Sequence, residues 1–207
     1  MSTGHTRSGM IERELSRRLR AAAVTYTQRG WPILPLSPAG DRPVARLSPA
    51  DQAMACEWWS EWPYGIGCRL GTRLDALQVP AEVGTRVLDR VRRQHQLEPP
   101  VIEVPAWQCW MFFVTPGAPR ILELVRYEQV RLHSRGAWVP LPPTNILDAE
   151  TRWVNEQDCV QLPHSLTAQW ILRGALRPPT TTSTTRRGRR NTAKPPTPTP
   201  AGAQTGA

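Results

Sequence analysis

The sequence predicts an α+β fold in which helices flank a mixed or antiparallel sheet. Three observations predict it: helical and extended segments are intermixed along the chain, two pairs of extended segments are joined by short turns, and these hairpins outnumber obvious crossover connections. The chain has 207 residues, of which 40% are hydrophobic, and it contains nine Trp. It is therefore long and apolar enough for one domain with a substantial core.

The first part of the domain is expected to contain a helix, an edge strand and a second helix. Apolar residues recur at helical spacing over residues 11–28, and Gly30 is expected to end that helix. Residues 31–36 are apolar but contain two prolines, which favour a strand at a sheet edge. A turn is expected at residues 38–41. The second helix is expected over residues 48–61, with its opening serine as the cap and an acid three residues later.

Strands and helices continue to alternate in the second part. Residues 74–79 predict a strand, and Pro80 is expected to open a helix that has one apolar face. A short helix is expected over residues 121–125. The last helix is expected over residues 165–172, and Gly174 is expected to end it.

Two hairpins complete the predicted elements. Residues 101–104 and 107–114 are extended and apolar, with a short Pro-containing connection between them. Residues 130–133 and 137–141 form a second predicted pair. The connection at residues 134–136 contains a glycine, which is typical of a hairpin turn.

Composition divides the chain into three parts. Residues 1–10 are expected to be a flexible N-terminus, residues 11–176 the folded domain, and residues 177–207 a disordered tail of Thr, Pro, Arg, Gly and Ala. From Arg173 onward there are six Arg, one Lys and no acidic residue, so this end contributes +7 of the formal net charge of +9. The folded part is therefore close to neutral, and the basic character belongs mainly to the tail.

The cysteine pattern and the hydropathy pattern argue against a zinc protein and a membrane protein. The four Cys form no CxxC pair, and no His lies at zinc-finger spacing from them, so reduced thiols are expected rather than a zinc site. The N-terminus has no apolar signal segment, and no apolar run approaches the roughly 20 residues that span a bilayer. We therefore expect a cytoplasmic protein without a membrane partner.

Three ordered segments resemble a known family. Residues 29–36 read Arg-Gly-Trp-Pro-Ile-Leu-Pro-Leu after an Ala-rich helix, and residues 58–71 contain a Trp-Trp pair, a Pro, an Ile-Gly step and a second glycine. Residues 130–144 contain a glycine turn followed by Pro-Pro-Thr. In this order the segments resemble the N-terminal primase/polymerase domain of bifunctional DNA primase/polymerases, a member of the archaeo-eukaryotic primase superfamily. The resemblance covers about residues 15–150 and implies a primase/polymerase-like fold.

The resemblance also implies where catalytic residues would lie. Nucleotidyl transfer needs metal ions held by carboxylates, which the family supplies as two acids on one strand and a third on a later strand, with a His between them. Here the two acids correspond to Gln78 and Pro80, the His to Met111, and the last acid to Arg131. None of these four side chains is a carboxylate or a His. The neighbouring Asp75 is expected to point to the other side of its strand. We therefore expect no catalytic residues and no metal or other cofactor, with magnesium implied only if activity is retained.

Basic residues suggest a different use of the same region. Strand alternation would place Arg131, His133 and Arg135 on one face if the strand stays regular that far, which predicts a metal-free face for phosphate or nucleic acid. A solvated hairpin with incidental arginines is the alternative. In the tail, four arginines form a compact cluster that could bind polyanions or only keep the chain soluble. They are Arg186, Arg187, Arg189 and Arg190.

The sequence leaves two classes of function open. One is a primase/polymerase-like protein of DNA replication or mobile-element biology that is catalytically inactive and binds single-stranded or duplex nucleic acid or nucleotides. Within the same family, an active enzyme with a rebuilt metal site is the alternative. The other class is a protein-interaction module that reuses the fold. The chain contains no nucleophile elbow, P-loop or dinucleotide fingerprint, so nothing in it supports a small-molecule enzyme.

Overall fold

The computed structural model describes residues 3–45, 47–94, 98–156 and 161–176. Helices and strands are intermixed along these ranges, as the sequence predicts. In chain order the elements are α1 (Thr3–Gln28), β1 (Ile33–Leu36), α2 (Gln52–Glu61), β2 (Gly65–Arg69), β3 (Asp75–Pro80), α3 (Ala81–Arg93), β4 (Val101–Val104), the 3-10 helix η1 (Pro105–Trp107), β5 (Cys109–Val114), α4 (Leu122–Val125), β6 (Arg131–His133), β7 (Trp138–Leu141), β8 (Asn145–Ile146), β9 (Ala149–Glu150), β10 (Arg152–Asn155) and α5 (Ser165–Leu176).

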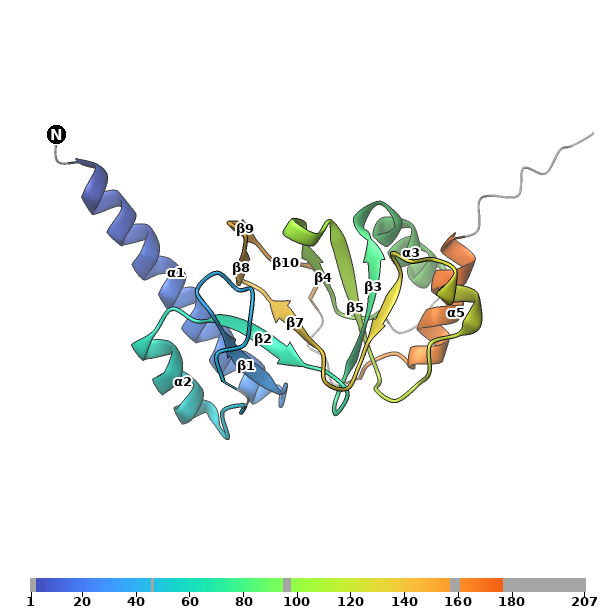
Figure 1. Cartoon of the computed structure of the whole chain (residues 1–207), viewed down its shortest axis with the longest axis horizontal. Coiled ribbons are helices and arrows are strands. Elements are labelled where there is room, and N and C mark those ends of the chain that lie inside the picture. Colours follow the sequence, from blue (N-terminus) through green and yellow to red (C-terminus); the bar gives the residue numbers. More distant parts are fainter. Residues whose placement is uncertain (1–2, 46, 95–97, 157–160, 177–207) are drawn as a thin grey trace, which may run out of the picture.

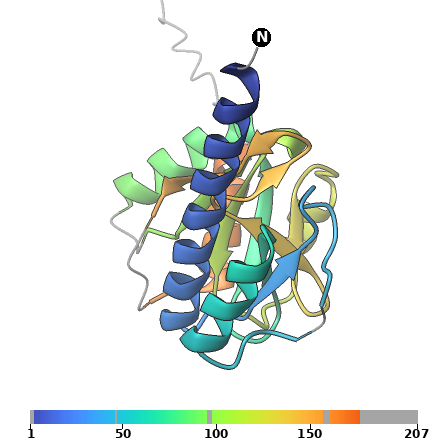
Figure 2. The same ribbon diagram turned by 90° about the vertical axis from the view of Figure 1, so that its left-hand side faces the viewer.

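The strands form two sheets and a short ribbon. The smaller sheet has the order β1-β2-β7, the larger has the order β10-β4-β5-β3-β6, and β8 pairs with β9. Every strand pairing in the described ranges is antiparallel. Figure 1 shows α1 and α2 beside the smaller sheet and α3 and α5 beside the larger one, and Figure 2 shows α2 lying alongside α1. The predicted α+β class with antiparallel sheets and flanking helices is confirmed, and β1 is an edge strand as its prolines predict.

One of the two predicted hairpins is wrong. β4 and β5 pair as expected, but β6 pairs with β3 in the larger sheet while β7 pairs with β2 in the smaller sheet. The turn at residues 134–136 therefore carries the chain from one sheet to the other. The loop between β2 and β3 makes the same crossing, and the two crossings touch: the Leu70 amide donates to the Ala137 carbonyl at 3.0 Å. The physical reason for the error is that a glycine turn fits either a hairpin or a crossing between sheets.

Two helix starts also differ from expectation. α1 begins at Thr3 rather than at Ile11. α2 begins at Gln52 rather than at Ser48. The cap is Asp51, whose carboxylate accepts a hydrogen bond from the Met54 amide at 2.9 Å. The acid that was expected inside the first turn is therefore the N-cap, and its carboxylate satisfies a backbone N–H group of that turn.

The last helix continues through the glycine that was expected to end it. α5 ends at Leu176, and Gly174 lies within its final turn. The small residue serves packing instead, because a Cβ at Gly174 would lie 2.7 Å from Cζ of Arg90 on α3. Arg90 also donates to the Gly174 carbonyl at 3.4 Å. Glycine therefore allows the two helices to approach closely.

The two faces of the larger sheet belong to different cores. Side chains such as Ala76, Met111 and Phe113 pack toward α1 and the smaller sheet. Their sequence neighbours, including Leu77 and Phe112, pack toward α3 and α5. This alternation decides which face each residue of β3 presents.

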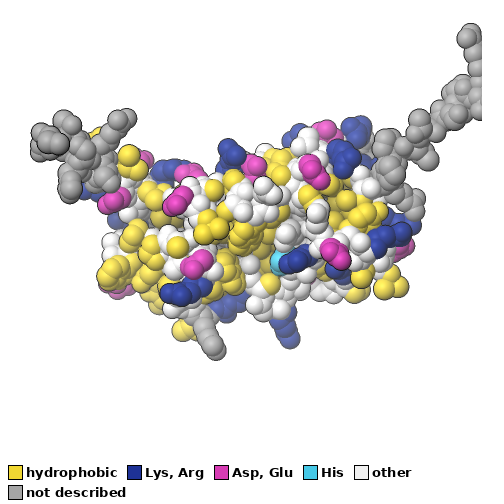
Figure 3. Space-filling model, turned by 45° about the horizontal axis from the view of Figure 1, so that its top comes forward, with side chains coloured by type: hydrophobic (Ala, Val, Ile, Leu, Met, Phe, Trp, Pro, Cys, Tyr) yellow, Lys and Arg dark blue, Asp and Glu magenta, His cyan; other side chains and the backbone are white. Residues whose placement is uncertain are grey.

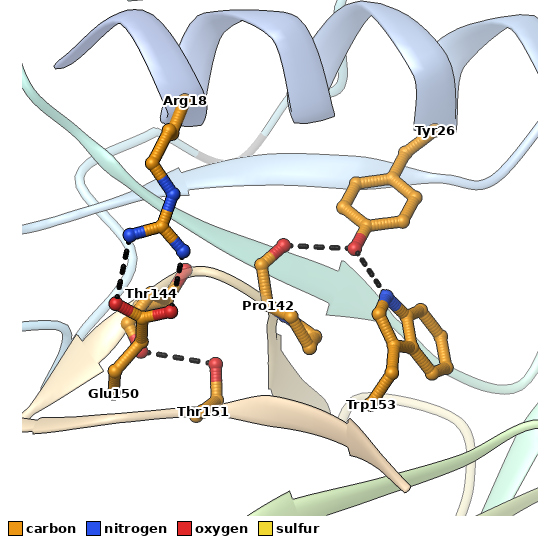
Figure 4. Close-up of polar contacts among 7 residues, drawn as sticks. All are labelled: Arg18, Tyr26, Pro142, Thr144, Glu150, Thr151 and Trp153. Atoms are coloured by element: carbon orange, nitrogen blue, oxygen red, sulfur yellow. Dashed lines mark hydrogen bonds and ion pairs between the residues drawn. The ribbon is translucent and has the colours of Figure 1, made fainter. Parts of the chain in front are cut away.

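Polar contacts tie α1 to the opposite strands (Figure 4). The buried Tyr26 hydroxyl donates to the Pro142 carbonyl at 2.8 Å and accepts from Trp153 Nε1 at 3.1 Å. Burial raises the pKa of Tyr26 above its ordinary value, so the phenol remains a donor. About two turns closer to the N-terminus, Arg18 donates two hydrogen bonds to Glu150, at 2.6 and 3.0 Å. These contacts anchor α1 to the segment after β7, to β9 and to β10.

The predicted basic tail, residues 177–207, lies outside the described residues, and so does its arginine cluster. Cys68 and Cys109 are buried and Cys56 is exposed, all three with free thiols. Among the helices in the described part of the chain, none has both the length and the apolar character needed to cross a membrane.

Candidate functional site

Three of the four positions singled out by the resemblance form one row across the larger sheet. β3 lies between β5 and β6, and Gln78 on β3 is directly opposite Met111 on β5 and Arg131 on β6. Directly opposite residues of an antiparallel pair project from the same face and have Cβ atoms about 5 Å apart. Pro80 lies two residues further along β3, opposite Cys109, and so shares this face. The four positions therefore lie on one face of the larger sheet.

Burial gives these side chains different roles. Met111 is completely buried and forms part of the core beneath the row, so it cannot touch a ligand. Gln78 and Pro80 are half-buried, whereas Arg131 is exposed. The accessible part of the row thus consists of an amide, a proline ring and a guanidinium.

A hollow of about 370 Å³ opens over this row. It lies at the C-terminal end of β3, beside η1 and the loop that precedes β6. Its lining residues are Gln78, Pro80, Trp107, Gln108, Cys109, Glu128, Gln129 and Arg131. On the side of the molecule seen in Figure 3, which takes in the front and the top of Figure 1, basic and acidic side chains are interspersed. This side therefore has no broad basic surface, and selectivity for an anion has to come from individual residues.

His133 fixes the side chain of Gln78. Nε2 of His133 lies 2.7 Å from Oε1 of Gln78, so the imidazole donates its N–H to the amide oxygen. Burial, and in second place the positive charge of Arg131, lower the pKa of His133 below its ordinary value. The imidazole is therefore neutral at neutral pH, and Arg131 is the permanent cation at this position.

Arg135 does not join the row. β6 ends at His133, so the strand alternation that was expected to bring Arg131, His133 and Arg135 onto one face stops before Arg135. Arg135 lies in the turn between the two sheets, where its backbone packs against Gly71. The chain brings Arg131 and His133 together, and it places Arg135 at the opposite end of β6 from the hollow.

Asp75 faces away from the hollow, as strand alternation predicts. It is 0% exposed, and one of its carboxylate oxygens accepts from the Gly117 amide at 3.1 Å. Its other oxygen has no hydrogen-bond partner among the described residues. The carboxylate therefore holds the loop after β5 and does not reach the side of Gln78.

Sequence reasoning missed five of the eight residues that line the hollow. Trp107 and Gln108 were expected at the start of a strand, but Trp107 ends η1, Gln108 is its C-cap, and β5 begins only at Cys109. Glu128 and Gln129 precede β6 in a loop, where no periodicity could reveal them. The sequence signal that could have identified the residues outside the strands is their position directly before strands that carry motif residues. Glu128 is the one carboxylate in the lining. In the described ranges no group of three or more His, Cys, Asp or Glu residues could hold a metal ion, and burial raises the pKa of Cys109 to about 12, so its thiol stays protonated.

The lowered pKa of His133 predicts a pH dependence of stability. The unfolded chain takes up a proton on this residue near pH 6.5, its ordinary pKa, while the folded protein resists protonation until lower pH. Stability is therefore expected to fall as the pH drops below about 6.5, because the unfolded state binds the proton first. Urea unfolding between about pH 7 and pH 5 should give a shallower decline for His133→Gln than for the native protein. The same substitution at the exposed His164 is the control, and an equal effect of both substitutions would contradict the prediction.

Comparison with protein families matches residues 23–170 to the family described as bifunctional DNA primase/polymerase, N-terminal. The matched range begins within α1, includes every strand described above and ends within α5. It therefore contains both sheets and the hollow. Comparison with curated proteins gives no match.

Proposed function

This chain belongs to the bifunctional DNA primase/polymerase N-terminal family, and we propose that it binds nucleic acid or nucleotides without catalysing nucleotidyl transfer. We propose that this binding takes place in DNA replication or in the biology of mobile elements. The observation that carries the proposal is the row of Gln78, Met111 and Arg131, which are in register across three strands. This is the row in which the resemblance expects acids and a histidine.

The donor set does not fit the metal ions that the family implies. Magnesium prefers hard oxygen ligands, and phosphoryl chemistry needs metal charge at the attacking and leaving oxygens. The Gln78 carbonyl oxygen already accepts from His133, and Pro80 has no side-chain oxygen. Arg131 brings a positive charge that repels a cation. The residues present at these positions therefore do not suit a magnesium ion.

Arg131 supports phosphate binding instead. A guanidinium presents several N–H donors in a plane, and these match the oxygens of a phosphate. Arg131 is exposed and lines the hollow, so its donors are available to a ligand. The hollow, at about 370 Å³, is of the size that holds small ligands. In this proposal a fixed cation binds the phosphate oxygens directly.

Glu128 supports the second candidate, an active enzyme with a rebuilt metal site. Magnesium is often held by one or two carboxylates together with substrate phosphates, and Glu128 borders the hollow. A metal bound there would depend mainly on oxygens of the substrate. The two candidates differ in whether magnesium is needed for binding and whether nucleotides are incorporated.

Replacement of Arg131 tests the proposal. The full chain, in buffer with EDTA, is titrated with a nucleoside triphosphate, and Arg131→Ala is compared with Arg86→Ala, an exposed arginine on α3. We expect Arg131→Ala to weaken binding by about tenfold or more, the loss expected for a charged hydrogen bond, and Arg86→Ala to have little effect. Equal affinity of the native protein and Arg131→Ala would rule out the phosphate site. The tail is present in every variant, so its contribution cancels.

A further inference from the structure

Two tryptophans lie side by side at the edge of the hollow. Trp107 ends η1 and lines the hollow, and Trp138 is the first residue of β7. Their ring centroids are 6.4 Å apart with an interplanar angle of 61°. Trp107 is 38% exposed, although the indole is a side chain that proteins usually bury well. An edge-to-face contact uses the edge of one ring and one face of the other, so the pairing itself leaves a face of each ring uncovered.

An arginine flanks this pair on each side. Arg69 on β2 is directly opposite Trp138 on β7, so the two side chains project from the same face of the smaller sheet. On the other side, Arg131 lines the same hollow as Trp107. Pairwise neighbours therefore connect the smaller sheet to the larger one in the order Arg69, Trp138, Trp107, Arg131, and we call these four residues the strip.

The chain segments that build the junction are free of acids. Residues 62–74 and 129–147 contain four arginines and no Asp or Glu. Among the described residues that line the hollow, Glu128 is the acidic one. Arg73 and Arg135, in the two touching loops at the far end of the junction, extend the basic character beyond the hollow. A phosphate backbone that follows the junction therefore meets cations at both ends.

We propose that the strip of Arg69, Trp138, Trp107 and Arg131 is a base-stacking platform for single-stranded nucleic acid. This inference rests on the proposed function and names its partner. Unpaired bases stack on indole faces whatever their sequence, whereas bases within a duplex are covered by their neighbours. A free nucleotide would fill the hollow and would not reach Arg69. A ligand that reaches both Arg69 on the smaller sheet and Arg131 on the larger one has to span the junction, as an oligonucleotide does.

Two oligomers of equal length separate stacking from charge. One is a fluorescein-labelled oligothymidine of about 12 nucleotides, within the range of single-strand sites, and the other is the same backbone without bases. In the full chain, Trp107→Ala is expected to weaken oligothymidine binding by about tenfold and to leave the abasic oligomer unchanged. The matched control is Trp62→Ala, which removes a tryptophan that is 60% exposed at the end of α2. Trp107→Phe keeps a ring and should retain most of the affinity.

The outcomes separate this inference from the proposed function. Loss of oligothymidine binding in Trp107→Ala, with retention in Trp107→Phe and Trp62→Ala, supports the platform. Unchanged oligothymidine affinity in a folded Trp107→Ala overturns it, and so does an equal loss in the Ala and Phe variants. If that happens while Arg131→Ala still weakens triphosphate binding, the phosphate site stands without the platform. Failure of both ligands to bind the native protein overturns both proposals.

Discussion

Replacing Gly71 with Ala is expected to lower the free energy of unfolding by about 2–5 kcal/mol. Gly71 has a φ of +93°, a conformation that costs a residue with a Cβ about 1–2 kcal/mol. A Cβ there would also lie 2.3 Å from Cα of Arg135, a backbone atom that cannot turn aside. This clash adds about 1–3 kcal/mol, because the two crossings between the sheets would have to separate. Urea unfolding followed by circular dichroism measures the effect.

Gly136→Ala is the matched control. Gly136 also has a positive φ, +86°, and lies in the turn that contacts Gly71, but nothing lies within 4 Å of a Cβ at that position. This variant keeps the conformational cost and lacks the clash, so we expect a loss of about 1–2 kcal/mol. Equal losses for the two variants would show that the crossings do not touch as described.

Trp59→Ala is expected to cost about 3–5 kcal/mol of stability. Trp59 is 2% exposed in the core beneath α2, and its Nε1 donates to the Tyr64 carbonyl at 2.9 Å. Truncation leaves a cavity that α1 and α2 cannot close and also leaves that carbonyl without its donor. Thermal unfolding should show a clearly lower midpoint for this variant.

Trp62→Ala tests the same substitution one turn further along. Trp62 is 60% exposed at the end of α2, so its loss should change stability by no more than about 0.5 kcal/mol. A comparable loss for Trp59→Ala and Trp62→Ala would contradict the assignment of Trp59 to the core. Trp62→Ala also serves as the control in the oligonucleotide experiment, so its stability has to be known.

Local sequence patterns predicted most elements but not their partners. Helical spacing predicted the end of α1 at Gln28, and the proline at position 80 predicted the step from β3 to α3. These features depend on neighbouring residues. The pairing of β6 with β3 depends on residues more than fifty positions apart, which a local pattern cannot reveal. The glycine turn before β7 was therefore interpreted as a hairpin, although it connects two sheets.

The candidate site was predictable only in part, for the same reason. The resemblance selected Gln78, Met111 and Arg131, and the sheet places these residues in register. The prediction that strand alternation continues to Arg135 was wrong, because β6 ends at His133. Trp107 lies in the single turn of η1 and Glu128 in a loop, and neither is long enough for a period to link a residue to the face that it lines. Their contribution became visible only from the packing of the strands.

The most direct test of the central claim is template-directed nucleotide incorporation by the full chain with magnesium present. We expect no magnesium-stimulated incorporation above background, because the positions Gln78, Pro80, Met111 and Arg131 on the face beneath the hollow provide no carboxylate. Glu128→Gln should then behave as the native protein does. Magnesium-stimulated incorporation that Glu128→Gln abolishes would contradict the account and establish a rebuilt metal site.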